Sequence, residues 1–208
     1  MATEIRTGGR RRGSFIEEAR RAQIGTAAIE TVAEFGYGNA SLARIADRAG
    51  ISKSVISYHF DGKGDLLNQV VTEFFADTWE YMSERLDAQT TYMGRVRVWV
   101  ESQLAYFGAH RSAFLAVIDI VVNHRNPDGS RPFADAEKEE VVALTEMLDA
   151  GQVFGEFRPL HSSSVAVVIV QCVDGALTRW IESDDNDLAA QSAALVDFIE
   201  HAIRKDTL

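Results

Sequence analysis

Short polar and basic side chains gather at helical spacing in residues 53–59, and their chemistry is that of hydrogen bonding to DNA. One predicted helix face carries the side chains of Lys53, Ser54, Ser57 and Tyr58. Hydroxyl and ammonium groups bond to base edges in the major groove and to phosphate oxygens. The pattern therefore predicts a DNA-reading helix, and the alternative is a helical hairpin with a solvated polar face.

Two short helices joined at a tight turn must hold this face outward, and residues 41–67 predict such a pair. Ile45 lies on the inner side of the first helix and Ile56 on the inner side of the second. Gly50 stands at the turn, where a positive φ would strain other residues. Ser52 is placed to cap the second helix through its hydroxyl oxygen.

A third predicted helix supports this pair from behind. Ser14 and Glu17 fit a capping box, which marks a helix start, and apolar residues follow at helical spacing as far as Gly36. Residues 1–13 are predicted to be a flexible arm that reaches phosphates or the minor groove. Its basic side chains are Arg10, Arg11 and Arg12. A disordered solubilising tail is the alternative.

Lys63 lies near the start of the next long helix, predicted over residues 65–86. The positive end of a helix dipole favours a nearby phosphate, so we expect Lys63 to face the DNA backbone. Together the candidate DNA-contacting residues are Arg10, Arg11, Arg12, Ser41, Arg44, Lys53, Ser54, Val55, Ser57, Tyr58, His59 and Lys63.

Several motifs occur together in residues 15–67. They are Phe35-Gly36-Tyr37, Ile45-Ala46, Ala49-Gly50-Ile51-Ser52-Lys53, Tyr58-His59-Phe60, and Lys63 followed by Asp65-Leu66-Leu67. On these motifs the segment resembles the DNA-binding domain of the TetR family of bacterial transcriptional regulators. The resemblance implies an all-helical homodimer with a DNA-reading N-terminal domain and a larger domain that binds a small-molecule inducer. The chain departs from the family pattern at Ala40, Ser57, Gly62 and Gly64.

Helical spacing continues past residue 65, and no strand-like alternation interrupts it. We predict an all-α fold with an N-terminal three-helix helix-turn-helix domain at residues 14–64. A larger helical ligand-binding and dimerisation domain follows at residues 65–208. Charge agrees with this division, because the net charge is −10 but residues 1–65 hold ten basic and eight acidic residues. Only the N-terminal part has the basic balance that favours DNA.

The inducer site is the least determined feature of the sequence. Small-molecule pockets combine apolar and aromatic side chains with a few polar ones. The candidates of this kind are Trp99, Gln103, Phe107, Phe114, Ile118, Val122, Asn123, Met147 and Cys172. Ordinary core or surface packing is the alternative for each of them.

The segment 164–182 carries two apolar stripes and only a narrow polar side. A helix that is apolar on two faces needs cover on both, so one face is predicted to meet a second subunit, together with the last helix at 188–203. A central helix in a monomer is the alternative. The candidate dimer residues are Val170, Val173, Leu177, Ile181, Leu195 and Ile199.

No sequence pattern indicates an enzyme, a cofactor or a metal site. The five histidines are scattered, and the single cysteine, Cys172, excludes an intrachain disulfide. No signal peptide or segment long enough to span a membrane is recognised, so a cytoplasmic location is expected. The predicted function is a repressor that binds a palindromic operator as a homodimer and is released by a small-molecule inducer. The alternative is a DNA-binding regulator whose C-terminal domain docks a partner protein.

Overall fold

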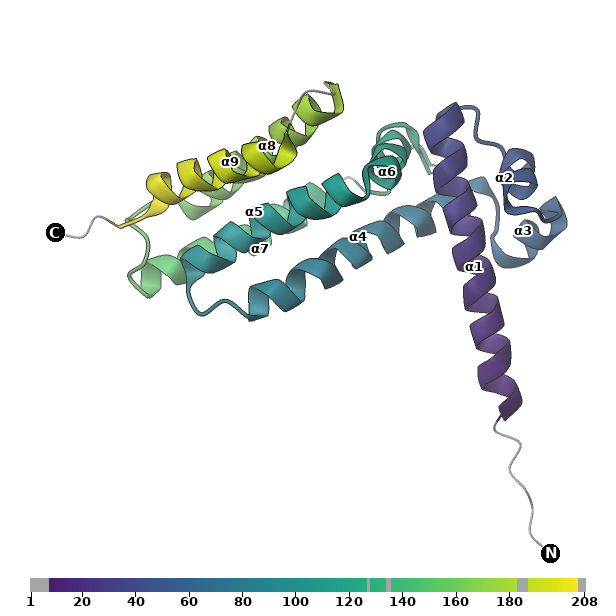
Figure 1. Ribbon diagram of the computed structural model, residues 1–208, viewed down its shortest axis with the longest axis horizontal. Helices are drawn as coiled ribbons and strands as arrows, with labels where there is room; N and C mark the ends of the chain where they lie inside the picture. The colour runs from purple at the N-terminus through teal and green to yellow at the C-terminus, as the bar shows by residue number, and fades with distance from the viewer. Residues whose placement is uncertain (1–7, 127, 134–135, 183–186, 206–208) are drawn as a thin grey trace, which may run out of the picture. The chain divides into compact units, whose positions relative to one another are not determined.

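The computed structural model describes residues 8–126, 128–133, 136–182 and 187–205, which are helical apart from turns and an isolated bridge between Phe157 and Arg204. In chain order the helices are α1 (Gly8–Phe35), α2 (Leu42–Ala49), α3 (Lys53–His59), α4 (Lys63–Asp87), α5 (Tyr92–Ala109), α6 (Arg111–Asn123), α7 (Ala136–Val153), α8 (Ser162–Glu182) and α9 (Leu188–Ile203) (Figure 1). The predicted all-α fold is confirmed.

Helices α2 and α3 form the predicted pair around a tight turn. Ala46 on α2 and Ile56 on α3 are buried. Gly50 ends α2 with a φ of 65°, and its N–H bonds back to the carbonyl oxygen of Ala46, a left-handed C-cap that favours glycine. Ser52 occupies the N-cap position of α3 but makes no capping bond, because its hydroxyl pairs with that of Ser54 at 2.8 Å. The turn was predicted correctly and the cap was not.

Helix α1 begins at Gly8, six residues before the predicted start at Ser14. Residues 8–13, which were predicted to belong to a flexible arm, are therefore helical. Arginine has a high helix propensity and no proline interrupts this run, so the helix continues through the predicted cap. The side chains of residues 10–12 lie outside the described part of the structure, and their contacts with DNA stay predictions.

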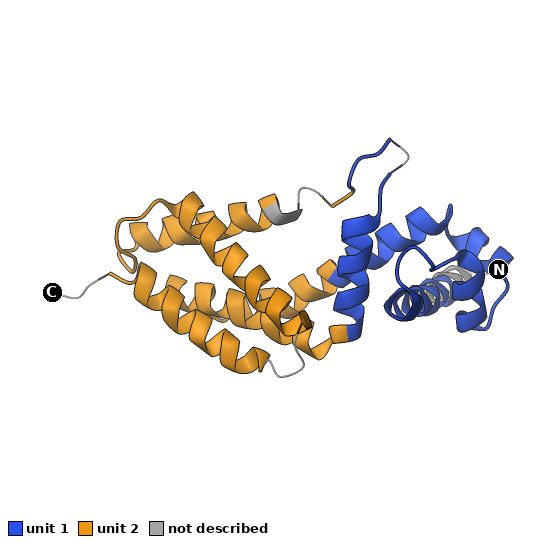
Figure 2. Ribbon diagram, turned by 90° about the horizontal axis from the view of Figure 1, so that it is seen from above, with its two compact units in different colours: residues 1–74, 112–131 blue, residues 75–111, 132–208 orange. Residues whose placement is uncertain are grey.

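The chain packs as two compact units, and their boundary differs from the predicted one. The first unit comprises residues 1–74 and 112–131, and the second comprises residues 75–111 and 132–208 (Figure 2). The predicted boundary after residue 64 placed α6 in the ligand-binding domain. In the structure α6 belongs to the first unit, where its Asp119 carboxylate accepts a hydrogen bond from the Tyr37 N–H at 2.6 Å.

The second unit is a helical bundle in which α5, α7, α8 and α9 pack against one another (Figure 1). Its core includes the fully or almost fully buried side chains of Trp99, Leu104, Leu144, Leu148, Val173 and Ile203. One acidic side chain, Glu200, is also buried. It accepts hydrogen bonds from Arg97 at 2.7 Å and from Arg204 at 3.0 Å, so its charge is paired.

Helix α8 is long and apolar enough to cross a membrane by length and composition, which differs from the prediction that no segment is. The core helix of a soluble protein has the same length and composition. One side of α8 is buried inside the second unit, through Ala166, Ile169, Val170, Val173 and Leu177. The apolar character of this helix is therefore explained in part by packing within the bundle.

Candidate functional site

Helix α3 presents polar side chains to solvent on the side away from its buried Ile56. The exposed residues are Lys53, Ser54, Ser57 and Tyr58, and Tyr58 is 76% exposed. Val55 and His59 are half-buried. Because a major groove about 12 Å wide admits an α-helix, this exposed face has the size and chemistry to contact base edges and phosphates.

An arginine of α1 fixes the C-terminal end of α3. The Arg21 guanidinium donates hydrogen bonds to the carbonyl oxygen of His59 and to the side-chain oxygen of Gln69. It also lies 4.4 Å from the centre of the Phe60 ring. The planar fork of arginine suits several partners at once. Arg21 was not among the predicted site residues, because nothing in the local pattern shows which partners a basic residue will meet.

Ser41 and Arg44 lie at the start of α2 and make local contacts. The Ser41 hydroxyl accepts a hydrogen bond from the Arg44 N–H at 3.3 Å, which caps the helix. The Arg44 guanidinium donates to the carbonyl oxygen of Asn39 at 2.9 Å and lies 4.7 Å from the centre of the Phe35 ring. Both side chains remain exposed, and their contacts with DNA stay predictions.

Lys63 turns towards Tyr37 within the first unit. Its ammonium donates to the carbonyl oxygen of Tyr37 at 2.6 Å and lies 4.2 Å from the centre of the Tyr37 ring. Burial lowers the pKa of Lys63, and the nearby Asp119 carboxylate opposes that shift. The predicted phosphate contact would therefore require Lys63 to leave Tyr37.

The candidate ligand residues do not form one cluster within a unit. Trp99, Gln103, Phe107, Met147 and Cys172 belong to the second unit, whereas Phe114, Ile118, Val122 and Asn123 belong to the first. Trp99, Gln103, Phe107 and Phe114 are buried. Val122 and Asn123 are exposed, because their side of α6 faces solvent, so the structure does not support a place for them in an enclosed pocket.

Two neighbouring polar side chains on α5 are buried in the second unit. Gln103 and Ser102 have almost no exposed surface. Among the described residues, the fully buried side-chain polar atom without a hydrogen-bond partner is Asn68 Oδ1, which belongs to neither of them. Gln103 and Ser102 are candidates for contact with a polar group of a ligand because they lie on the same helix as the buried aromatic side chains of Trp99 and Phe107.

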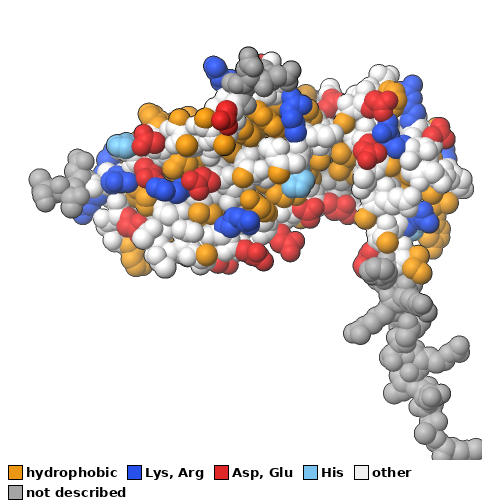
Figure 3. Space-filling model, viewed as in Figure 1, with side chains coloured by type: hydrophobic (Ala, Val, Ile, Leu, Met, Phe, Trp, Pro, Cys, Tyr) orange, Lys and Arg blue, Asp and Glu red, His pale blue; other side chains and the backbone are white. Residues whose placement is uncertain are grey.

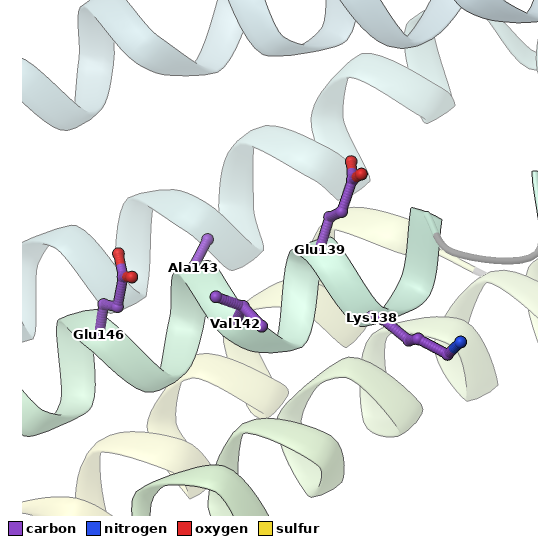
Figure 4. Close-up of a pocket in the computed structure, with 5 residues that line it drawn as sticks. All are labelled: Lys138, Glu139, Val142, Ala143 and Glu146. Carbon is purple, nitrogen blue, oxygen red and sulfur yellow. The ribbon is translucent and has the colours of Figure 1, made fainter.

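A surface hollow of about 360 Å³ lies along α7 and is lined by Lys138, Glu139, Val142, Ala143 and Glu146 (Figure 4). All five residues come from one helix, and the hollow is open to solvent. A ligand in it would stay largely hydrated, whereas small-molecule sites usually enclose most of the ligand surface. The hollow contains none of the predicted ligand residues.

The structure distinguishes the two apolar sides of α8 and α9. Four of the predicted dimer residues are buried inside the protomer, namely Val170, Val173, Leu177 and Ile199. Ile181 and Leu195 are half-buried. The exposed large apolar side chains on these helices are instead Val167, Val168 and Phe198. The predicted stripe is the one that faces the core, because periodicity alone does not tell which of two apolar sides is covered.

Acidic side chains line one side of α4. Its exposed carboxylates are Glu73, Asp77, Glu80, Glu84 and Asp87. Figure 3 shows acidic side chains gathered along this helix. Their spacing of three and four residues places them on one helix face. A negative stripe repels phosphates, so this face of α4 does not suit DNA.

Residues 24–70 match the family model of bacterial regulatory proteins of the tetR family. Over 190 residues the chain is 30% identical to an HTH-type transcriptional repressor of Mycobacterium tuberculosis, covering 90% of this chain and 94% of that protein. Over 184 residues it is 24% identical to the fatty acid metabolism regulator protein of Bacillus subtilis, covering 87% of this chain and 94% of that protein. These relatives are named as regulators.

Solved structures show the same fold. A protein from Saccharomonospora viridis, solved in complex with choline, has a TM-score of 0.77 and 25% sequence identity, covering 91% of this chain and 99% of that one. The transcriptional regulator FadR from Bacillus subtilis, solved in complex with stearoyl-CoA, has a TM-score of 0.76 and 23% identity, covering 88% of this chain and 99% of that one.

Proposed function

Because this chain belongs to the TetR family of bacterial transcriptional regulators, we propose that it represses transcription by binding a palindromic operator as a homodimer. A small-molecule inducer releases it. The proposal places the protein in the cytoplasm, where operator DNA is. The observation that carries it is the exposed polar face of α3, which is held outward by the buried Ile56 and the Gly50 turn.

In this proposal α3 enters the major groove. Lys53 is the residue on its exposed face that can form the strongest base contact, because lysine donates to guanine O6 and N7. Ser54 and Ser57 supply short donors and acceptors, and Tyr58 reaches a phosphate. Arg21 keeps the end of α3 in place through the carbonyl oxygen of His59.

The Lys53→Ala substitution is expected to weaken operator binding and to relax the preference for one base pair in each half-site. A good base contact is worth about 1–3 kcal/mol of discrimination. Selection of bound fragments from a random DNA pool gives the operator, and fluorescence anisotropy then gives the affinity of each variant. Lys205→Ala is the matched control, because Lys205 is an exposed lysine outside the DNA-reading part.

The control protein should keep both the affinity and the selected sequence. If wild-type protein selects no sequence from the pool, the proposed function is wrong. If Lys53→Ala weakens all sequences equally, Lys53 contacts phosphate and not a base.

The homodimer is proposed to form through the exposed apolar side chains of α8 and α9, which are Val167, Val168 and Phe198. Large apolar groups gathered on a surface are typical of a protein interface. Binding to a palindromic operator requires a twofold axis that sets two copies of α3 about 34–36 Å apart, one turn of DNA. The predicted set Val170, Val173, Leu177 and Ile199 is not part of this proposal, because those residues are buried within one protomer.

The inducer is proposed to bind in the second unit, with Gln103 as its polar anchor. Gln103 is a buried polar residue of α5, and Trp99 and Phe107 of the same helix are also buried. Similar folds hold choline or stearoyl-CoA. Both compounds carry a hydroxyl or carbonyl oxygen that an amide N–H can bind.

The Gln103→Met substitution is expected to change the free energy of unfolding by less than about 1.5 kcal/mol, because methionine has a similar length and fills the same buried space. Chemical denaturation measures this change. The same variant should lose the rise in melting temperature that choline or stearoyl-CoA gives wild-type protein. An unchanged rise in melting temperature in Gln103→Met would show that Gln103 does not contact the ligand.

Release follows if the inducer binds better to a state that does not fit the operator. A differential affinity of about 1–3 kcal/mol changes DNA affinity by about 5–150-fold. Gly62, with a φ of 129°, stands immediately before α4, and Gly64 is the second residue of that helix. These two glycines are the proposed hinge. Glycine has no Cβ and adopts this φ without strain, so the backbone can change direction here more readily than within a helix.

A further inference from the structure

A cluster of titratable side chains joins α6 to the DNA-reading part of the first unit. Tyr37 lies between α1 and α2, and Lys63 begins α4. Asp119 lies on α6, and His124 follows its last residue. None of Tyr37, Asp119 and His124 is among the proposed DNA contacts, so DNA binding does not account for this cluster.

Tyr37 is held at three points. Its hydroxyl oxygen lies 2.9 Å from Nδ1 of His124, and its N–H donates to the Asp119 carboxylate at 2.6 Å. Its carbonyl oxygen accepts from the Lys63 ammonium at 2.6 Å. Two of these three contacts come from α6 and the residue that follows it. They therefore attach α6 to the segment between the first two helices of the DNA-reading part.

The His124 ring is enclosed on more than one side. Only 6% of the residue is exposed. A Cβ at position 64 would lie 3.2 Å from Cε1 of the ring, which is closer than ordinary van der Waals contact. Gly64 therefore lets α4 approach the imidazole on one side, while Tyr37 bonds to it on another. A ring held in this way has little room to turn towards a new partner.

The charges around His124 favour its neutral form. Burial lowers its pKa below the ordinary value of about 6.5, and the positive charges of Lys63 and Arg125 lower it further. The Asp119 carboxylate is already bonded to the N–H of Tyr37 and to the side-chain amide of Asn123. A neutral imidazole can accept a hydrogen bond from the Tyr37 hydroxyl, whereas an imidazolium has only donors.

We propose that His124 is a proton-sensitive latch that attaches α6 to the DNA-reading part through Tyr37. At neutral pH the uncharged ring accepts the hydroxyl proton of Tyr37, and the latch is closed. Protonation at lower pH forces the Tyr37 hydroxyl to change from donor to acceptor and adds a positive charge beside Lys63 and Arg125 in a buried site, so the latch opens. In the unfolded chain His124 protonates at a higher pH than in the folded protein, because burial lowers its folded pKa. Acidification below about pH 6.5 therefore also lowers the free energy of unfolding.

Hydrogen–deuterium exchange at about pH 7.5 and about pH 5.5, corrected for intrinsic exchange rates, tests the latch in the full chain. In wild-type protein the protection of the Tyr37 amide and of the last turn of α6 is expected to fall several-fold on acidification. The His124→Asn variant should show equal protection at both pH values, because its amide oxygen can accept the same bond but does not titrate.

The His110→Asn variant is the matched control, because His110 is an exposed histidine at the end of α5. It should behave as wild-type protein does. The latch is wrong if wild-type protection does not change with pH, or if His124→Asn still loses protection in acid. The Tyr37→Phe variant, measured by the same exchange experiment, provides a second test if His124→Asn does not fold. It should show low protection at both pH values, and a wild-type response in it would overturn the proposal.

The effect of the latch on regulation rests on the proposed function. Loosening α6 widens the range of positions open to the DNA-reading part, which lowers affinity for two half-sites at fixed spacing. We expect operator affinity to fall several-fold from about pH 7.5 to about pH 5.5 in wild-type protein and not in His124→Asn. Equal losses in both would overturn the regulatory role. Absence of sequence-specific binding at both pH values would contradict the proposed function, and the exchange data would still decide the latch.

Discussion

The Val168→Asp substitution is expected to convert dimers of this protein into monomers. Val168 is 54% exposed on α8 in a single protomer, and the proposed interface covers it. Twofold symmetry places two new carboxylates in that interface. Burying each without a partner costs about 2 kcal/mol or more, so the dimer Kd should rise about a thousandfold. Sedimentation velocity over a dilution series measures the change.

Operator affinity should fall in the same variant, because two linked DNA-reading parts bind two half-sites much more tightly than separate ones do. Val153→Asp is the matched control, since Val153 is also exposed but lies at the end of α7. It should remain dimeric and keep its operator affinity. A Val168→Asp protein that stays dimeric at low concentration would show that the partner covers another face.

The Trp99→Ala substitution is expected to cost about 3–5 kcal/mol of unfolding free energy, which is the usual loss for a buried tryptophan. Trp99 is 2% exposed in the core of the second unit. Removal of its indole deletes many contacts and leaves a cavity that the surrounding helices close only in part. Chemical denaturation followed by circular dichroism gives the change.

Trp79→Ala supplies the matched comparison, because Trp79 is 54% exposed on α4. Its loss should change the unfolding free energy by only about 0.5 kcal/mol, as is usual for surface positions. A similarly small loss for Trp99→Ala would mean that its indole lines a pocket and not a packed core. That result would favour the ligand role that its aromatic character suggested.

Features that depend on neighbouring residues were predictable from the sequence. The turn at Gly50 involves groups within five positions of each other, and the structure has it. Helix α9 has the predicted bounds, Leu188–Ile203. The polar face of α3 is exposed as its spacing predicted. Local hydrogen bonds and helical periodicity decide these features, so a short stretch of sequence contains the information.

Features that depend on distant residues were not predictable. Tyr37 and His124 are 87 residues apart in the chain, and their contact is part of what places α6 in the first unit. Gly151 is required because a Cβ there would overlap the buried ring of Phe157. No spacing rule pairs residues across such separations, since their meeting depends on how whole helices pack.

By itself the sequence determined the helices, the turn between α2 and α3 and the chemistry of the face that α3 presents. Only the tertiary structure decided which side of α8 is buried, with Val170 and Val173 inside and Val168 outside. The physical reason is that periodicity records which residues of a helix share a side, whereas burial depends on the neighbours that this side meets. A helix with two apolar sides can bury either side, and the packing of the neighbouring helices decides which one.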